Sequence, residues 1–107
     1  MTYQVQLTQE ARQDLLDLHD YVAAHDSPAK ADALLVRLED VCANLARLPN
    51  RGHCPPELKR IGVELYREIH FKPYRVFFTI DRNEVVVRAI LDGRRDMQSL
   101  LEHRLIR

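Results

Sequence analysis

The sequence has few cysteines and none of the standard motifs of metal, redox or nucleotide sites. Its two cysteines, Cys42 and Cys54, are too few and too far apart for a zinc knuckle or a redox pair. It contains no glycine-rich phosphate loop, no HExxH and no GxSxG. Its apolar runs are too short to cross a bilayer, and its N-terminus shows an alternating pattern instead of a signal peptide. We therefore expect a cytoplasmic protein with reduced thiols and with no metal, cofactor or membrane contact.

The charge balance also excludes a class of function. The chain has 16 basic and 16 acidic residues, whereas general nucleic-acid coat proteins depend on an excess of lysine and arginine. The charges are unevenly placed: residues 9–40 are rich in acids, and the tail from Arg82 to Arg107 is rich in arginine. The length of 107 residues and the composition predict one globular domain spanning residues 1–107.

Two amphipathic helices are predicted in the first half. Thr8 is the expected N-cap of a helix over residues 9–24, where apolar residues recur at helical spacing. Ser27-Pro28 signals the start of a second helix. Its broad apolar stripe includes Cys42, which we expect in the core, and the helix is predicted to end at Leu48-Pro49. The short link predicts an antiparallel helical hairpin.

Four strands and a terminal helix complete the predicted fold. The strands are expected at residues 3–7, 63–71, 74–80 and 84–91. Turns at Lys72-Pro73 and at residues 81–84 join the last three as antiparallel neighbours. Asp96 is the expected cap of a short helix ending near Arg104. The order β-α-α-β-β-β-α predicts an α+β fold, with the helical hairpin packed on an antiparallel sheet.

The candidate functional residues are basic ones in the second half. They are Arg67, Lys72, Arg75, Arg88, Arg94 and Arg95. For each of these residues taken singly, a structural role as the partner of a glutamate on a neighbouring strand explains it as well as a functional role does. Together, a cluster near one end of the sheet is suited to binding phosphate or an acidic partner. The five histidines lack metal-ligand spacing and are expected at the surface or an interface, and Glu68 and His70 are expected on a solvated sheet face.

Fragments along nearly the whole chain carry a resemblance to a known superfamily. They are Tyr3-Gln4-Val5, Thr8-Gln9-Glu10-Ala11, Asp14-Leu15, Tyr21, Ser27-Pro28, Ala31, Leu48-Pro49, Gly52, Arg67-Glu68-Ile69, Pro73-Tyr74-Arg75-Val76 and Gly93-Arg94-Arg95-Asp96. Each fragment is short, but their joint order resembles the RelE/ParE superfamily of bacterial type II toxin–antitoxin toxins. The resemblance implies a growth-arresting toxin that is neutralised by a cognate antitoxin.

The superfamily has two main activities, and both remain open for this sequence. RelE-like members cut messenger RNA on the ribosome without a metal, whereas ParE-like members inhibit DNA gyrase. The resemblance matches Arg75 and Arg95 to basic positions of the nuclease branch, but Leu100 or Leu101 stands where that branch has a tyrosine, and His103 lies beyond it. Because leucine cannot donate a proton, the resemblance is closer to ParE. A third hypothesis is a degenerate toxin that only serves as a scaffold for its antitoxin.

The resemblance to ParE implies roles for particular residues. Arg94, Arg95 and Asp96 are expected to bind the target, and the chain is then an inhibitor, not an enzyme. If it is a nuclease, the catalytic residues are expected to be Arg75, Arg95 and His103. An antitoxin, expected to be ParD-like, is predicted to cover Arg67, Arg75 and Arg88 with an acidic segment and to form a toxin–antitoxin hetero-oligomer. The toxin alone is not expected to bind specific DNA.

Overall fold

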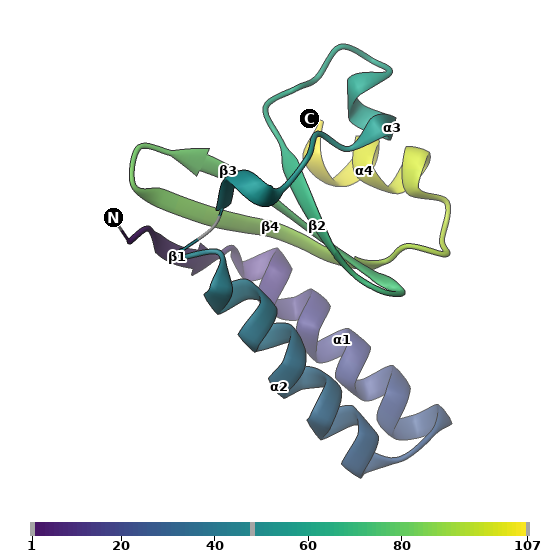
Figure 1. Cartoon of the computed structure of the whole chain (residues 1–107). Helices are drawn as coiled ribbons and strands as arrows, with labels where there is room; N and C mark the ends of the chain where they lie inside the picture. Colours follow the sequence, from purple (N-terminus) through teal and green to yellow (C-terminus); the bar gives the residue numbers. More distant parts are fainter. Residues whose placement is uncertain (1, 48, 107) are drawn as a thin grey trace.

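A four-stranded sheet lies between two helical layers in the computed structural model, which describes residues 2–47 and 49–106 (Figure 1). The strands are β1 (Gln4–Leu7), β2 (Arg67–Phe71), β3 (Tyr74–Asp81) and β4 (Glu84–Asp92). The helices are α1 (Gln9–His25), α2 (Pro28–Asn44), the 3₁₀ turn η1 (Pro49–Arg51), α3 (Pro56–Lys59) and α4 (Met97–Leu105). The predicted α+β class and the predicted order of strands and long helices are confirmed.

The sheet differs from the prediction in one respect, because it is mixed. Its strand order is β1-β4-β3-β2. β2, β3 and β4 are antiparallel neighbours as expected, but β1 pairs with β4 in parallel. The alternating pattern of residues 3–7 predicts a strand but carries no information about its direction. The direction follows from the α1–α2 hairpin, which separates β1 from the rest of the sheet and packs α1 across β4.

Each face of the sheet has its own apolar core. The face under α1 and α2 buries Leu38, Cys42, Val76 and Phe78, among others, so the predicted core position of Cys42 is confirmed. The opposite face is covered by α3 and α4, with Phe77 at its centre. Because the second face is covered as well, residues on both sides of β3 are withdrawn from water.

A β-bulge in β4 changes which positions of the strand face each core. Phe77 pairs with Ala89 but the next residue, Phe78, pairs with Val87, so Arg88 is the extra residue. Before the bulge, Val85 and Val87 face α1 and α2; after it, Ile90 faces them, and Ala89 and Leu91 belong to the core under α3 and α4. A bulge shifts the alternation of a strand by one residue, which explains why β4 does not keep one regular polar face.

Three predicted boundaries are corrected by the structure. The second helix ends at Asn44, and Leu48, its predicted end, lies outside the described residues. β2 begins at Arg67 instead of residue 63, because Val63 N–H donates to Leu58 O and closes the end of α3. The predicted loop over residues 49–62 contains η1 and α3. None of the described helices combines the length and the apolar character needed to cross a membrane.

Candidate functional site

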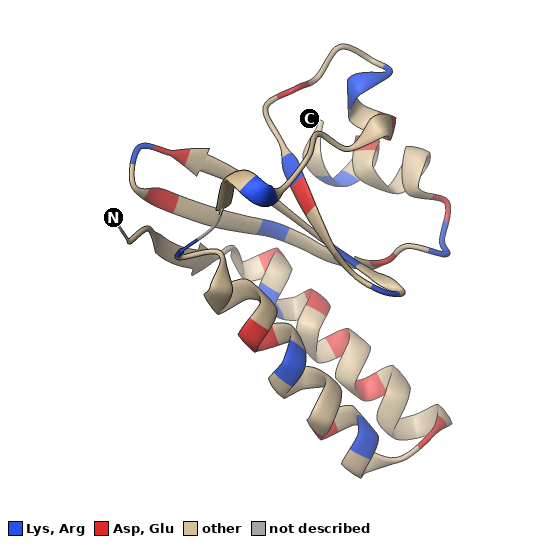
Figure 2. Ribbon diagram, in the orientation of Figure 1, with Lys and Arg blue, Asp and Glu red and all other residues tan. Residues whose placement is uncertain are grey.

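The connection between β4 and α4 presents charge at the edge of the molecule (Figure 2). Arg94 has 72% of its side chain exposed and donates from Nε and Nη2 to the carboxylate of Asp92, at 3.0 and 2.6 Å. This pairing lowers the pKa of Asp92 and raises that of Arg94. Arg95 is exposed, and its guanidinium donates no hydrogen bond to any residue that the structure describes. Asp96 caps α4, where its carboxylate accepts from Ser99 N at 3.3 Å.

Arg75 lies in a very different environment. Its guanidinium donates to both oxygens of Glu57, at 2.8 Å each, and to both oxygens of Glu68, at 2.6 and 2.8 Å. Glu68 is fully buried and the side chain of Arg75 is 12% exposed. The bond to Arg75 lowers the pKa of Glu57, and the two carboxylates raise the pKa of Arg75. Gly93 makes room for this side chain, since a Cβ there would lie 2.9 Å from Arg75 Cδ.

The expectation that Glu68 lies on a solvated sheet face is therefore wrong. Its face of β2 is covered by α3, which supplies Glu57, and the loop that follows η1. Burial of a carboxylate requires a charged or hydrogen-bonded partner, and Arg75 is that partner. Glu57 was missed by the sequence interpretation, because nothing in a proline-rich loop indicates a contact with a distant strand.

The residues matched to the nuclease branch are not all gathered around one opening. Arg95 and His103 line one shallow hollow of about 370 Å³ together with Leu100. Arg75 does not line it, and its guanidinium is turned toward Glu57 and Glu68. Leu101 is fully buried in the core between α4 and the sheet. Whether this set has any catalytic role stays a prediction.

The arginines expected to contact an antitoxin all have partners within the chain. Arg67 donates to the backbone oxygen of Gly52 at 2.8 Å, and Arg88 donates from Nε to Thr79 Oγ1 at 3.1 Å. With Arg75, both are only partly accessible. Their antitoxin role stays a prediction, and the geometry gives each of them a structural role.

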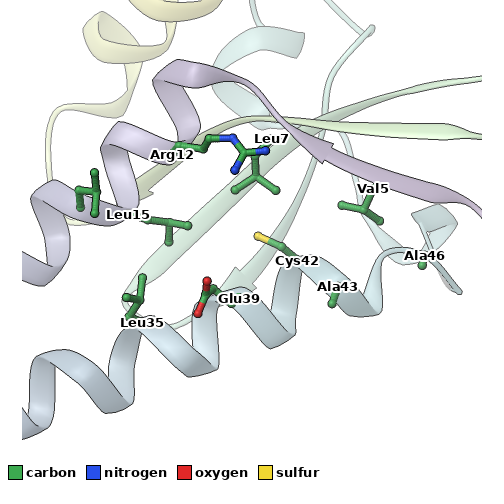
Figure 3. Close-up of a pocket in the computed structure, with 10 residues that line it drawn as sticks. Val5, Leu7, Arg12, Leu15, Leu35, Glu39, Cys42, Ala43 and Ala46 are labelled. Carbon is green, nitrogen blue, oxygen red and sulfur yellow. The ribbon is translucent and has the colours of Figure 1, made fainter.

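An apolar groove lies between the helical hairpin and β1 (Figure 3). It has a volume of about 680 Å³. Arg12 and Glu39 are its charged members, whereas the others are apolar: Val5, Leu7, Leu15, Leu16, Leu35, Cys42, Ala43 and Ala46. β1 is an edge strand of the sheet, so an unpaired backbone edge runs beside this groove. The arrangement is suited to an amphipathic segment from another protein.

Comparison with known proteins places this geometry in a family. The family model described as the ParE toxin of the type II toxin–antitoxin system parDE matches residues 5–97. No curated protein matches the chain. Solved structures also share the fold, and they include the following two. A chain of the chromosomal ParDE system from P. aeruginosa has a TM-score of 0.70 and 20% identity, over 83% of this chain and 94% of that chain. A chain of the RelBE2 toxin–antitoxin complex from Mycobacterium tuberculosis has a TM-score of 0.63 and 24% identity, over 86% of this chain and 92% of that chain. Because the family model covers most of its length, the chain belongs to the ParE toxins of type II toxin–antitoxin systems.

Proposed function

We propose that this toxin inhibits DNA gyrase by binding it through the exposed connection between β4 and α4. The observation that carries the proposal is the contrast between two arginines. Arg95 is exposed and donates no hydrogen bond to the described residues, so it is available to a partner. Arg75 is held by two carboxylates inside the fold. The connection between β4 and α4 thus offers Arg95 to a partner beside the ion pair of Arg94 with Asp92. Among the residues that the structure describes, Arg75 does not join Arg95 and His103 at one opening.

The environment of Arg75 also bears on the nuclease alternative. Cleavage of RNA by its own 2′-hydroxyl needs a base, an acid and cations beside the phosphate. A phosphate at Arg75 would have to displace Glu57 or Glu68, and the remaining carboxylate would repel it. The resemblance matches the nuclease tyrosine to Leu100 or to the buried Leu101, and neither side chain has an ionisable proton to donate. These features favour an inhibitor that works by occupying its target.

A cognate antitoxin is the second partner in this proposal. The apolar groove between the hairpin and β1 fits the apolar face of an amphipathic helix, and the free edge of β1 fits an added strand. Arg12 and Glu39 at the groove offer one charge of each sign to such a helix. The resulting complex is a toxin–antitoxin hetero-oligomer.

Two assays run side by side test the proposal. The purified chain is added to a gyrase supercoiling reaction and, separately, to ribosomes translating a defined message. We expect supercoiling to stop and the message to stay intact. In the variant Arg95→Gln, inhibition of supercoiling should fall at least tenfold while the circular dichroism spectrum is unchanged. Intact supercoiling at a large excess of toxin, with codon-position cuts in the message, would establish the nuclease alternative instead.

A further inference from the structure

Two histidines that are far apart in the sequence meet around the buried Glu68. After η1, the chain runs beside β2, and His53 forms a single bridge with Glu68. His53 N–H donates to Glu68 O at 3.1 Å, and Glu68 N–H donates to His53 O at 2.8 Å. Directly opposed residues place their side chains on the same face, and His70 shares that face because it lies two residues further along β2.

The side-chain atoms converge at the distances of a small site. His70 Nε2 lies 2.8 Å from Glu68 Oε1, and His53 Nε2 lies 3.3 Å from Glu68 Oε2. The two imidazole centroids are 5.3 Å apart, and the ligand atoms of all three residues lie within 4.8 Å of one another. The histidine side chains are 57% and 42% exposed, whereas that of Glu68 is fully buried. The carboxylate of Glu68 therefore lies buried at the base of the cluster, and the two imidazoles lie on its solvent-exposed side.

We propose that this cluster binds a divalent transition-metal ion, with Zn²⁺ as the best fit. The ligands are Nε2 of His53, Nε2 of His70 and the carboxylate of Glu68, and water takes the fourth position. Two imidazoles and one carboxylate are an established donor set for Zn²⁺. Ligand atoms roughly 2.0–2.2 Å from a tetrahedral Zn²⁺ are about 3.3–3.6 Å apart. The exposed imidazoles reach this spacing by small rotations of their side chains.

The lone pairs of Glu68 are distributed in a way that suits this site. Each carboxylate oxygen has two acceptor positions. Arg75 occupies one on each oxygen, at 2.6 and 2.8 Å, and the histidines face the others. A metal ion takes the place of the imidazole N–H groups and leaves the contact with Arg75 intact. Arg75 thereby fixes the orientation of the Glu68 carboxylate, as residues hydrogen-bonded to metal ligands do in other metal sites.

The proposed ion is held by its donor atoms and not by the net charge around them. Glu57 and Glu68 carry two negative charges, and Arg75 pairs with both. Arg60 also acts on Glu57, and Arg67 donates to the backbone oxygen of Gly52 beside His53. Binding joins the loop after η1 to β2, and it therefore stabilises the side of the sheet where α3 packs. This inference does not depend on which target the toxin inhibits.

Metal titration of the full-length chain, without an affinity tag and stripped with a chelator, tests the proposal. Zn²⁺ affinity is measured by competition with a chromophoric chelator, and Co²⁺ absorption reports the coordination geometry. We expect one equivalent to bind, the visible spectrum of tetrahedral Co²⁺, and a rise in melting temperature with Zn²⁺. His53→Gln and His70→Gln should each weaken binding at least ~100-fold, since even outer-shell changes cost up to that much.

Two control variants separate this site from adventitious binding. His25→Gln removes another exposed histidine, and Cys54→Ser removes the thiol next to His53; both should bind Zn²⁺ as the parent chain does. Circular dichroism of each metal-free variant checks that it is folded. The proposal is overturned if the parent chain binds neither ion, or if His53→Gln and His70→Gln retain the parent affinity. If Cys54→Ser loses Zn²⁺ binding while His53→Gln and His70→Gln keep it, the ligand is the thiol, and the proposal is overturned in that case too.

Discussion

Replacing Arg75 by glutamine tests whether this residue supports the fold or faces a ligand. In the structure its guanidinium is the counter-charge of Glu68, which is fully buried, and of Glu57 on α3. Removing one partner of a buried ion pair leaves an uncompensated charge and costs about 3–5 kcal/mol. Small domains are stable by about 5–15 kcal/mol in total. Arg75→Gln should therefore remove about a fifth or more of the free energy of unfolding.

The assay is urea unfolding at pH 7, followed by circular dichroism, with Arg95→Gln as the matched control. Arg95 is exposed, so the same chemical change there should leave the unfolding midpoint within experimental error. The two variants then separate two roles. Arg75→Gln is expected to lower stability, whereas Arg95→Gln is expected to lower activity against gyrase.

The stability difference should also depend on pH. Arg75 lowers the pKa of Glu57 below its ordinary value of 4.5 in the folded chain. A lowered folded-state pKa contributes stability that is complete above the unfolded pKa and is lost as the pH falls through the folded pKa. The gap between the parent chain and Arg75→Gln should be largest near pH 7 and should narrow below about pH 4.5. A loss no larger than that of Arg95→Gln, or a gap unchanged at pH 3, would refute this reasoning.

Two further substitutions test the groove and the junction of the helices. Leu16→Glu places a charge in the apolar groove and should weaken antitoxin binding, measured by calorimetry. The control is Val36→Glu, because Val36 is about as exposed as Leu16 but lies outside the groove, so this change should leave binding intact. Equal losses of affinity in the two variants would show that the groove is not part of the interface. Asp14→Ala strips the carboxylate that accepts from Ile90 N at 3.0 Å and from two guanidinium nitrogens of Arg104 at 2.9 Å each. It should lower the free energy of unfolding by about 3 kcal/mol or more, and a loss below 1 kcal/mol would contradict that role.

Local signals in the sequence predicted most of the fold. Thr8 and Ser27 cap α1 and α2 as expected, accepting from backbone N–H groups at 3.1 Å, and Asp96 caps α4. These signals work because a cap and its helix are adjacent in the chain. The turn after Asp81 was found for the same reason, since Asp81 pairs with Glu84.

The contacts that the sequence did not reveal are between distant segments. Arg75 binds Glu57, which is 18 residues away in the sequence, and Arg104 binds Asp14, which is 90 residues away. Charged residues of this kind are expected at the surface, so composition gave no reason to bury them. The neighbourhood of Arg75 and Glu68 follows partly from the β2–β3 hairpin, whose register pairs His70 with Arg75. No periodic pattern predicts that His53 joins the edge of that hairpin.

The dependence of gyrase inhibition on the ratio of toxin to gyrase tests the central claim most directly. Supercoiling is measured at several fixed gyrase concentrations while the toxin is increased, with Arg95→Gln as the comparison. An inhibitor that occupies its target through Arg94 and Arg95 requires toxin in proportion to gyrase, and the variant should shift the whole curve to higher toxin. Inhibition by a small fraction of one toxin per gyrase, or equal curves for the two proteins, would contradict the account.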